Sequence, residues 1–286
     1  MKNFLLAIFV LILACNPVFA IKIGLLTDVD KTGVGTSNSG VIIDARSNRT
    51  VMQLEQMKGY LIVPHKHKIA INVNGNLKEV DSDRIVIKSN GNGFVSAKKR
   101  WYRGKLIIQN RNGKLTVIND IDIENYLKGV IPSEMPIGWD FEAHKAQAIA
   151  ARSYALANLG KRASNGYDLN DTPNDQAYGG ASAETKGTTQ AVNDTRGIVL
   201  TYNQKIISAF YTASAGGQTK TANGWGGDVP YLRSVPSYDA SVGKKGHGIG
   251  MSQHGANALA KKGYNAYQIL KYFYKDVSFA RLKTEI

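Results

Sequence analysis

The first third of the chain alternates short apolar runs with turn-forming residues. Residues 40–43, 60–63 and 84–87 are rich in valine, isoleucine and leucine, and glycine, asparagine, aspartate and serine separate these runs. Short β-branched runs bounded by such residues are typical of β-strands. In residues 68–73 large apolar side chains alternate with small or polar ones, as in a strand with one buried face. The pattern predicts a β-rich module over residues 21–98.

A β-hairpin is predicted directly after this module. Apolar residues 106–108 and 115–118 flank the sequence NRNG at residues 110–113. The Asn-Gly pair in this sequence tolerates the positive φ angles of a tight hairpin turn. We expect residues 120–130 to form a linker that leads the chain away from the hairpin.

Helical spacing begins at about residue 140. From there onward alanines recur at intervals of three, four and seven residues, which predicts a long helix with a seam of small side chains. Gly160 is expected to end this helix. Because strands and helices interleave without a βαβ repeat, the chain is expected to have an α+β fold. The other elements expected in this half are helices over residues 181–193, 252–262 and 266–274 and strands around residues 198–202 and 206–211.

The chain has 286 residues and a formal net charge of +14, and this length suffices for one large domain or two modest ones. The positive excess favours a polyanionic partner such as nucleic acid, anionic lipid or cell wall. Lys2, an apolar run over residues 4–14 and a small-residue end at Ala20 are typical of a secretory signal peptide. The run is too short to span a bilayer comfortably. Export to the periplasm or cell wall is therefore expected, which argues against nucleic acid.

The single cysteine, Cys15, allows a second interpretation of this segment, in which it is the lipid-bearing first residue of a membrane-anchored lipoprotein. Leu13 fits the preceding position poorly, so we prefer cleavage after Ala20. The mature protein then has no thiol for a disulfide, a nucleophile or a metal ligand. The expected parts are a signal peptide over residues 1–20, a β-rich accessory module over residues 21–98 and a second domain over residues 99–286.

The sequence IPSEMP at residues 131–136 places Glu134 between two prolines. Each proline fixes its own φ angle and disfavours helical geometry at the residue before it, so Ile131 and Met135 are expected to be extended. Glu134 is then expected on a stiff loop, which suits a catalytic acid that must meet one substrate atom. On these six residues alone, an acid that merely decorates the turn into the next helix is the simpler interpretation.

Four further blocks change this interpretation. They are the helical sequence at residues 140–155, DQAYGG at residues 175–180, SAGGQT at residues 214–219 and GHGIGMSQHGA at residues 246–256. In their order and spacing they resemble the sporulation stage II protein D (SpoIID/LytB) family of lytic transglycosylases, from about Trp101 to about Phe279. The resemblance implies that residues 99–286 form a mixed α/β catalytic domain with a sugar-binding cleft.

The resemblance also implies an activity. The chain would be an exported enzyme that cuts the bond between N-acetylmuramic acid (MurNAc) and N-acetylglucosamine (GlcNAc) in peptidoglycan strands stripped of their peptides, leaving 1,6-anhydro ends. A carboxylic acid with a raised pKa can protonate the departing oxygen. The sugar's own C6 hydroxyl then attacks C1 in place of water, so one carboxyl group suffices. Glu134 matches the catalytic glutamate of the family, whereas Asp140 and Glu142 are better explained as charges that favour a helix N-terminus.

The same resemblance supplies the remaining site residues. Alternating glycines in GHGIGMSQ let backbone approach a ligand closely, and its polar side chains suit sugar hydroxyl and acetamido groups. The structural alternative is a glycine-rich turn in which Ser252 caps the next helix. Trp139, Trp225, Tyr178 and Tyr211 could stack on sugar rings, and Tyr178 is the favoured one. The expected substrate-binding residues are Gln147, Arg152, Tyr154, Gln176, Tyr178, His247, Ser252 and Gln253.

In some relatives the segment ahead of the Gln-x-Tyr block supplies cysteine and histidine ligands to zinc. Here Asn170, Asn174 and Asp175 occupy those places, and they lack the soft ligand atoms that zinc prefers. The acids of this segment do not form an EF-hand loop, because the required glycine and glutamate are missing. We therefore expect no metal and no other cofactor, and activity should survive treatment with EDTA.

Two other functions stay open at this point. The LytB name within the family implies a non-catalytic peptidoglycan-binding protein that activates an N-acetylmuramoyl-L-alanine amidase, and such a protein would not need Glu134 as an acid. The other is a basic lipoprotein that tethers the envelope to the wall through Cys15. The expected partners are peptidoglycan glycan strands and a cell-wall amidase, with membrane contact only through the signal peptide or the lipid anchor.

Overall fold

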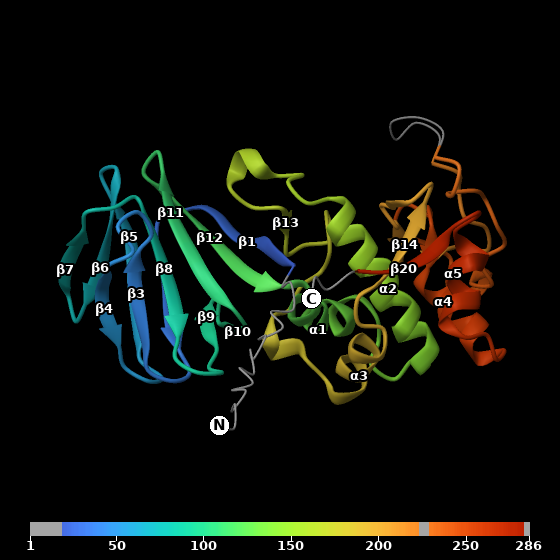
Figure 1. Ribbon diagram of the computed structural model, residues 1–286, viewed down its shortest axis with the longest axis horizontal. Coiled ribbons are helices and arrows are strands. Elements are labelled where there is room, and N and C mark those ends of the chain that lie inside the picture. Colours follow the sequence, from blue (N-terminus) through green and yellow to red (C-terminus); the bar gives the residue numbers. More distant parts are fainter. Residues whose placement is uncertain (1–18, 223–228, 283–286) are drawn as a thin grey trace, which may run out of the picture.

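The computed structural model describes residues 19–222 and 229–282 of the chain. The fold is α+β, as the sequence predicts, with strands over residues 20–122 and the helices after them (Figure 1). Among the described residues, no helix is long and apolar enough to cross a bilayer. Residues 1–18 of the expected signal peptide, including Cys15, and the aromatic candidate Trp225 lie outside the described residues.

Two sheets form the N-terminal half. The pairing is antiparallel throughout, except that the two-residue edge strand Leu169–Asn170 runs parallel to its neighbour. In spatial order, the larger sheet contains β13 (Leu169–Asn170), β1 (Ala20–Val29), β12 (Lys114–Asp122), β11 (Lys105–Arg111), β8 (Arg84–Ser89), β3 (Gly40–Asp44) and β4 (Thr50–Leu54). The smaller sheet contains β10 (Arg100–Tyr102), β9 (Val95–Ala97), β2 (Thr32–Thr36), β5 (Gly59–His65), β6 (Lys68–Val73) and β7 (Asn76–Val80).

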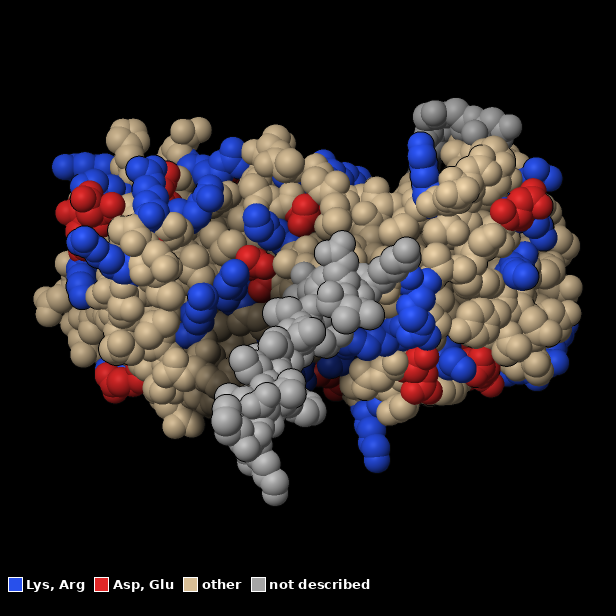
Figure 2. Space-filling model, viewed as in Figure 1, with Lys and Arg blue, Asp and Glu red and all other residues tan. Residues whose placement is uncertain are grey.

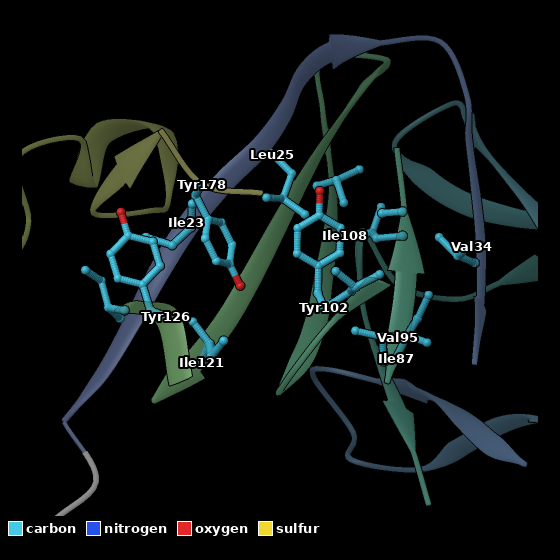
Figure 3. Packing of buried hydrophobic residues seen from close by; sticks show 14 of the residues in the cluster. Ile23, Leu25, Val34, Ile87, Val95, Tyr102, Ile108, Ile121, Tyr126 and Tyr178 are labelled. Carbon is cyan, nitrogen blue, oxygen red and sulfur yellow. The ribbon is translucent and has the colours of Figure 1, made fainter. Parts of the chain in front are cut away.

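The two sheets share one hydrophobic core. Ile87 and Ile108 of the larger sheet and Val34 and Val95 of the smaller one belong to the same buried cluster (Figure 3). Apolar side chains reach this core because successive residues of a strand point to opposite faces of the sheet. The strands predicted over residues 40–43, 60–63, 68–73 and 84–87 are confirmed as β3, β5, β6 and β8.

The predicted hairpin is also confirmed, as β11 and β12. Asn112 and Gly113 have φ angles of 54° and 82°, the paired positive values that a two-residue hairpin turn requires. β11 also pairs with β8, so the larger sheet uses strands from both sides of the boundary expected between residues 98 and 99. That boundary stays a prediction about domains, whereas the hydrogen-bonded sheet is continuous across it.

Helix α1 (Ile123–Glu134) stands where a linker was expected over residues 120–130. It begins at Asp122, whose side chain accepts hydrogen bonds from two backbone N–H groups of the first turn. The expectation that Ile131 is extended is wrong, because Ile131 is a helical residue with its side chain buried in the core. Burial of the apolar face therefore outweighs the local preference of a residue that precedes proline.

Glu134 is the last residue of α1 and does not lie on a loop. Pro132 is inside the final turn of the helix, and Ser133 Oγ donates a hydrogen bond to the Gly129 carbonyl. Met135 ends the helix in an extended conformation, with φ −130° and ψ 143°, as its place before a proline predicts. Glu134 therefore lies at the end of a helix, directly before a residue with restricted backbone angles, and not on the loop that the sequence predicted.

The long helix α2 (Phe141–Ala157) runs through the centre of the C-terminal half (Figure 1). It ends at Asn158, two residues before the glycine expected to stop it. Its alanines let α1, α4 (Gln253–Lys261) and α5 (Ala266–Phe273) pack closely against it. A second hydrophobic cluster, which includes Ile149, Leu200 and Phe273, lies here.

The strand predicted around residues 198–202 and the two closing helices are confirmed as β14 (Ile198–Tyr202), α4 and α5, whereas two other predicted elements are divided. The helix expected over residues 181–193 is split into a 3₁₀ turn, η2 (Ala181–Ala183), and helix α3 (Lys186–Asp194). The strand expected around residues 206–211 is likewise divided between two short pairings. The other elements are η1 (Ala163–Asn165), η3 (Ala240–Val242), β15 (Lys205–Ile206), β16 (Tyr211–Thr212), β17 (Ser214–Ala215), β18 (Lys244–Lys245), β19 (Met251–Ser252) and β20 (Ser278–Arg281).

Candidate active site

A cavity of about 600 Å³ lies at the C-terminal end of α1, and segments far apart in the sequence enclose it. Four of the residues expected from the sequence line it, namely Glu134, Tyr154, His247 and Gln253. The parallel pairing of β16 with β19 holds two of these segments together, since Tyr211 lies opposite Met251. The sequence blocks around residues 134 and 247–253 therefore meet in one pocket.

The Glu134 carboxylate accepts three hydrogen bonds in this pocket. The backbone N–H of Ala177 donates to Oε1 at 2.7 Å, and the Tyr211 hydroxyl donates to the same oxygen at 3.3 Å. The side-chain amide of Gln253 donates to Oε2 at 3.2 Å. These donors come from a loop, from strand β16 and from the start of helix α4, so the tertiary fold alone assembles them.

Burial raises the pKa of the Glu134 carboxyl group above its usual value, because desolvation penalises the charged form. The hydrogen bonds from Ala177, Gln253 and Tyr211 act in the opposite direction and are outweighed. The result is a carboxyl group that holds its proton to higher pH and still has donors ready for the ionised form. This is the balance that a group acting first as an acid and then as a base requires.

Two further hydrogen bonds connect Tyr211 to the protein interior. The Tyr126 hydroxyl donates to Gln176 Oε1 at 3.1 Å, and Gln176 Nε2 donates to the Tyr211 hydroxyl at 3.0 Å. Gln176 is fully buried and does not line the cavity. It was expected to contact substrate. In the structure it instead contacts Tyr211, which in turn hydrogen-bonds to Glu134. Tyr211 was considered only as an aromatic platform, and no spacing in the sequence indicates its contact with Glu134.

His247 lines the cavity wall opposite the Ala177 loop. Its Nδ1 accepts a hydrogen bond from the backbone N–H of Ile249 at 3.0 Å, so the neutral ring carries its proton on Nε2. Burial lowers the pKa of His247, against a hydrogen bond with the Tyr211 backbone that raises it. The ring is therefore neutral at pH 7. The glycines were expected to let backbone approach a ligand, and at Gly250 the close approach is instead to the protein's own backbone, since a Cβ atom would lie 1.9 Å from the Phe210 carbonyl oxygen.

Ser252 is buried away from the cavity, and its side chain accepts from Gly255 N as the N-cap of α4. Its hydroxyl donates to Asp239, a buried carboxylate that also accepts from Ser214, Ser237 and two backbone N–H groups. Burial acts to raise the pKa of Asp239, but these hydrogen bonds outweigh it and lower the pKa to about 2. Ser252, expected at the substrate, therefore belongs to a structural cluster around Asp239, which no sequence signal identified.

Three more of the expected substrate contacts lie inside the protein. Arg152 is fully buried and forms two hydrogen bonds with the Glu124 carboxylate, at 2.9 and 2.7 Å. Tyr178 lies between two other tyrosines in the core, and its hydroxyl donates to Asn119 (Figure 3). Gln147 is also fully buried, and its side-chain amide has no partner among the described residues. None of the three lines the cavity, because each is enclosed by packing around α1 and α2.

The segment that carries zinc ligands in some relatives is held here by charge pairs. Lys161 Nζ lies 2.8 Å from Asp175 Oδ1, and Arg162 Nε lies 2.5 Å from Oδ2, which also accepts from the Asn170 N–H. Asn174 lines the cavity beside Asp175, the acid that these two cations already pair with. Within residues 19–222 and 229–282 no group of three histidine, cysteine, aspartate or glutamate side chains could hold a metal ion. The residues present do not fit a zinc site, since both oxygens of Asp175 are already engaged.

Comparison with known proteins points to one family. The sequence pattern of the family described as Stage II sporulation protein (SpoIID) matches residues 111–202. This match, together with relatives named stage II sporulation protein D and amidase enhancer, supports the SpoIID family. The matched residues contain Glu134, Asp175 and Gln176, whereas Tyr211, His247 and Gln253 lie beyond them and reach the pocket through the fold.

Three relatives show how far the similarity extends. The chain is 36% identical over 196 residues to an uncharacterized protein of Brachyspira hyodysenteriae, covering 68% of this chain and 49% of that one. It is 46% identical over 107 residues to the amidase enhancer of Bacillus subtilis, covering 37% and 14% of the two chains. With stage II sporulation protein D of the same organism the identity is 29%, covering 57% and 76%. The chain thus spans about half or less of the first two relatives.

Proposed function

We propose that this protein is an exported lytic transglycosylase that cuts the MurNAc–GlcNAc bond of peptidoglycan glycan strands, with Glu134 as its single acid and base. Export through a signal peptide over residues 1–20 is part of the proposal, as is a location in the periplasm or cell wall. The positive charge spread over both halves of the face in Figure 2 supports an anionic polymer as substrate.

One observation carries the proposal. The cavity is lined by two acidic residues, and only Glu134 lacks a cationic partner, because Asp175 is paired with Lys161 and Arg162. A hydrolase of the usual kind needs a second carboxylate free to act as base or nucleophile. Asp175 is engaged on both oxygens, so the described pocket offers one carboxyl group for chemistry. A reaction in which the substrate supplies its own nucleophile is the one that fits.

The proposed reaction consists of two proton transfers by the Glu134 carboxyl group. The protonated Glu134 donates to the glycosidic oxygen while the bond from C1 of MurNAc to that oxygen breaks, and the GlcNAc part of the strand departs as an alcohol. The carboxylate then accepts the proton of the C6 hydroxyl as O6 bonds to C1. Glu134 regains its proton, a 1,6-anhydro ring forms and no water is consumed. Tyr211 and Gln253, which hydrogen-bond to the carboxylate, stabilise it between the two proton transfers.

The decisive experiment incubates the purified protein with glycan strands stripped of peptides and with peptide-bearing strands, and identifies the products by mass spectrometry. Anhydro ends are expected, and reducing ends would show hydrolysis instead. Glu134→Gln should bind glycan and yield no product, because an amide cannot deliver the proton. Glu55→Gln, at an exposed turn of the β half, is the matched control and should cleave at the parental rate. Cleavage by Glu134→Gln at that rate would show that the role is assigned to the wrong residue.

Removal of metal tests the same site independently. EDTA should leave activity unchanged, since lysine and arginine occupy the oxygens of Asp175. Inactivation that added zinc reverses would contradict this.

A second candidate function rests on the relative named amidase enhancer, to which this chain is 46% identical over 107 residues. In that case the protein would bind peptidoglycan and stimulate a cell-wall amidase. Stimulation of an amidase by both the parent and Glu134→Gln, with no anhydro product from either, would favour this function over cleavage.

A further inference from the structure

A second cavity of about 390 Å³ adjoins the Glu134 pocket. The two cavities share Ser133 and Ala177, the residues directly beside Glu134 in the chain and in its hydrogen bonding. The second cavity lies where the end of α1 meets η2 and β10, the strand that begins at Arg100. A group attached to a sugar in the first cavity can therefore extend into the second without leaving the protein surface.

Arg100 and Asp171 are the charged residues that line this side pocket, and they are not paired with each other. Asp171 is nearly buried, and Lys98 Nζ lies 2.6 Å from its Oδ2, so this acid is already paired. Arg100 is exposed, and its guanidinium group contacts the Tyr178 carbonyl at 3.5 Å, the outer limit of a hydrogen bond, and the Tyr102 hydroxyl. No carboxylate among the described residues lies within ion-pair distance of Arg100, so its charge is available to a ligand in the cavity.

An arginine without an ion-pair partner beside a sugar pocket favours one kind of ligand group. The guanidinium fork matches the two oxygens of a carboxylate, and it matches a neutral amide or hydroxyl less well. The MurNAc ring carries a lactyl ether on O3, which ends in a carboxylate when the stem peptide is absent and in an amide when the peptide is attached. The charge of this substituent is therefore what distinguishes the two kinds of strand next to the reacting sugar.

We propose that this side pocket is a subsite for the lactyl substituent of the sugar held at Glu134, and that Arg100 binds its carboxylate. The inference rests on the proposed function, because it takes MurNAc as the sugar in the first cavity. Arg100 is then a specificity-determining residue that makes no contact with the bond being cut.

The test measures glycan binding by the full chain carrying Glu134→Gln, so that nothing is cleaved. Three oligosaccharides are compared: a peptide-free strand with its lactyl carboxylates, the same strand with each carboxylate converted to a methylamide, and a GlcNAc oligomer of equal length. The carboxylate form should bind about fivefold more tightly than the methylamide, the size expected of a well-formed but partly exposed ion pair. This difference should shrink with added salt.

Adding Arg100→Gln should abolish the difference between carboxylate and methylamide and leave binding of the GlcNAc oligomer unchanged. Arg100→Lys should keep part of the difference, because it retains the charge and loses the fork. Arg49→Gln, which removes the same charge from the β3–β4 turn at the far end of the β half, should keep all of it (Figure 1).

The assignment is wrong if the carboxylate preference survives Arg100→Gln or is missing from the parent. It is also wrong if peptide-bearing strands bind more tightly than peptide-free ones and lose that advantage in Arg100→Gln, since the carboxylate would then belong to the peptide. The proposed function fails separately, when unmodified protein releases no anhydro product from strands whose binding depends on Arg100.

Discussion

The two halves of this molecule bury different kinds of side chain. In the β half, Ile42, Ile62, Ile71 and Ile87 are fully buried and form one apolar core between the sheets. In the helical half, the interior also contains charged side chains, among them Glu124, Arg152 and Asp239, whereas the buried polar side chains of the β half, such as Asn119, are uncharged.

The difference follows from how each half satisfies its backbone hydrogen-bonding groups. Regular strands satisfy their own backbone groups, so apolar side chains alone can fill the space between two sheets. The helical half must instead fix several short strands and loops around a pocket, and their free backbone groups need partners. Asp239 supplies such partners to Ala215 and Gly217. Some polar residues in the family's sequence blocks therefore hold the pocket walls in place and do not meet the ligand.

The largest stability effect should come from the buried ion pair. Glu124→Ala leaves the Arg152 guanidinium buried without its carboxylate, which should cost about 3–5 kcal/mol of unfolding free energy. Ile71→Val in the β half removes one methylene group and should cost about 1 kcal/mol. Urea unfolding followed by circular dichroism measures both. A loss in Glu124→Ala no greater than that in Ile71→Val would contradict the contrast drawn between the two halves.

A smaller effect, with a distinctive pH dependence, should follow Asp239→Asn. Loss of the charge-assisted hydrogen bonds should cost about 1–3 kcal/mol at neutral pH. Because the pKa of Asp239 is lowered from 3.8 to about 2, its stabilising contribution is present above pH 3.8 and is lost as the pH falls through about 2. Unfolding curves recorded from pH 7 to pH 2 should show the parent and the variant converging at the acid end. A difference that stays constant over this range would show that ionisation of Asp239 is not its cause.

The smallest effect should be a shift in the pH profile of cleavage after Tyr211→Phe. The Tyr211 hydroxyl donates to Glu134 and so lowers the pKa of that carboxyl group, and its removal should raise this pKa further. In the proposed reaction the protonated form of Glu134 is the active acid, so activity should fall as the pH rises through the pKa of Glu134, and in the variant this fall should move to higher pH. At neutral pH kcat/KM should change by about fivefold or less.

Tyr202→Phe, which changes a tyrosine that does not line the pocket, is the matched control for this profile. An unchanged profile in Tyr211→Phe would mean that this hydroxyl does not tune Glu134 in solution.

Local pattern was sufficient for the regular elements and insufficient where burial competes with it. The strands of the β half and the hairpin at Asn112 and Gly113 were predicted because alternation and turn chemistry act over a few residues. Helix α1 was missed, because two prolines argued for a loop and the burial of Ile131 could not be read from its neighbours. The same limit explains why Gln176 and Ser252 were expected at the substrate.

The amino-acid sequence by itself was enough to predict the α+β class, the resemblance to the SpoIID family and Glu134 as the candidate acid. Each depends on residue order alone, through periodicity or through blocks of characteristic spacing. Only the tertiary structure decided which polar residues reach the pocket and which support it, because hydrogen bonding between distant segments depends on how α1, α2 and the loops pack. The raised pKa of Glu134 is of the same kind: burial raises it, against hydrogen bonds from Ala177, Tyr211 and Gln253 that lower it and that come from residues more than 40 positions away in the sequence.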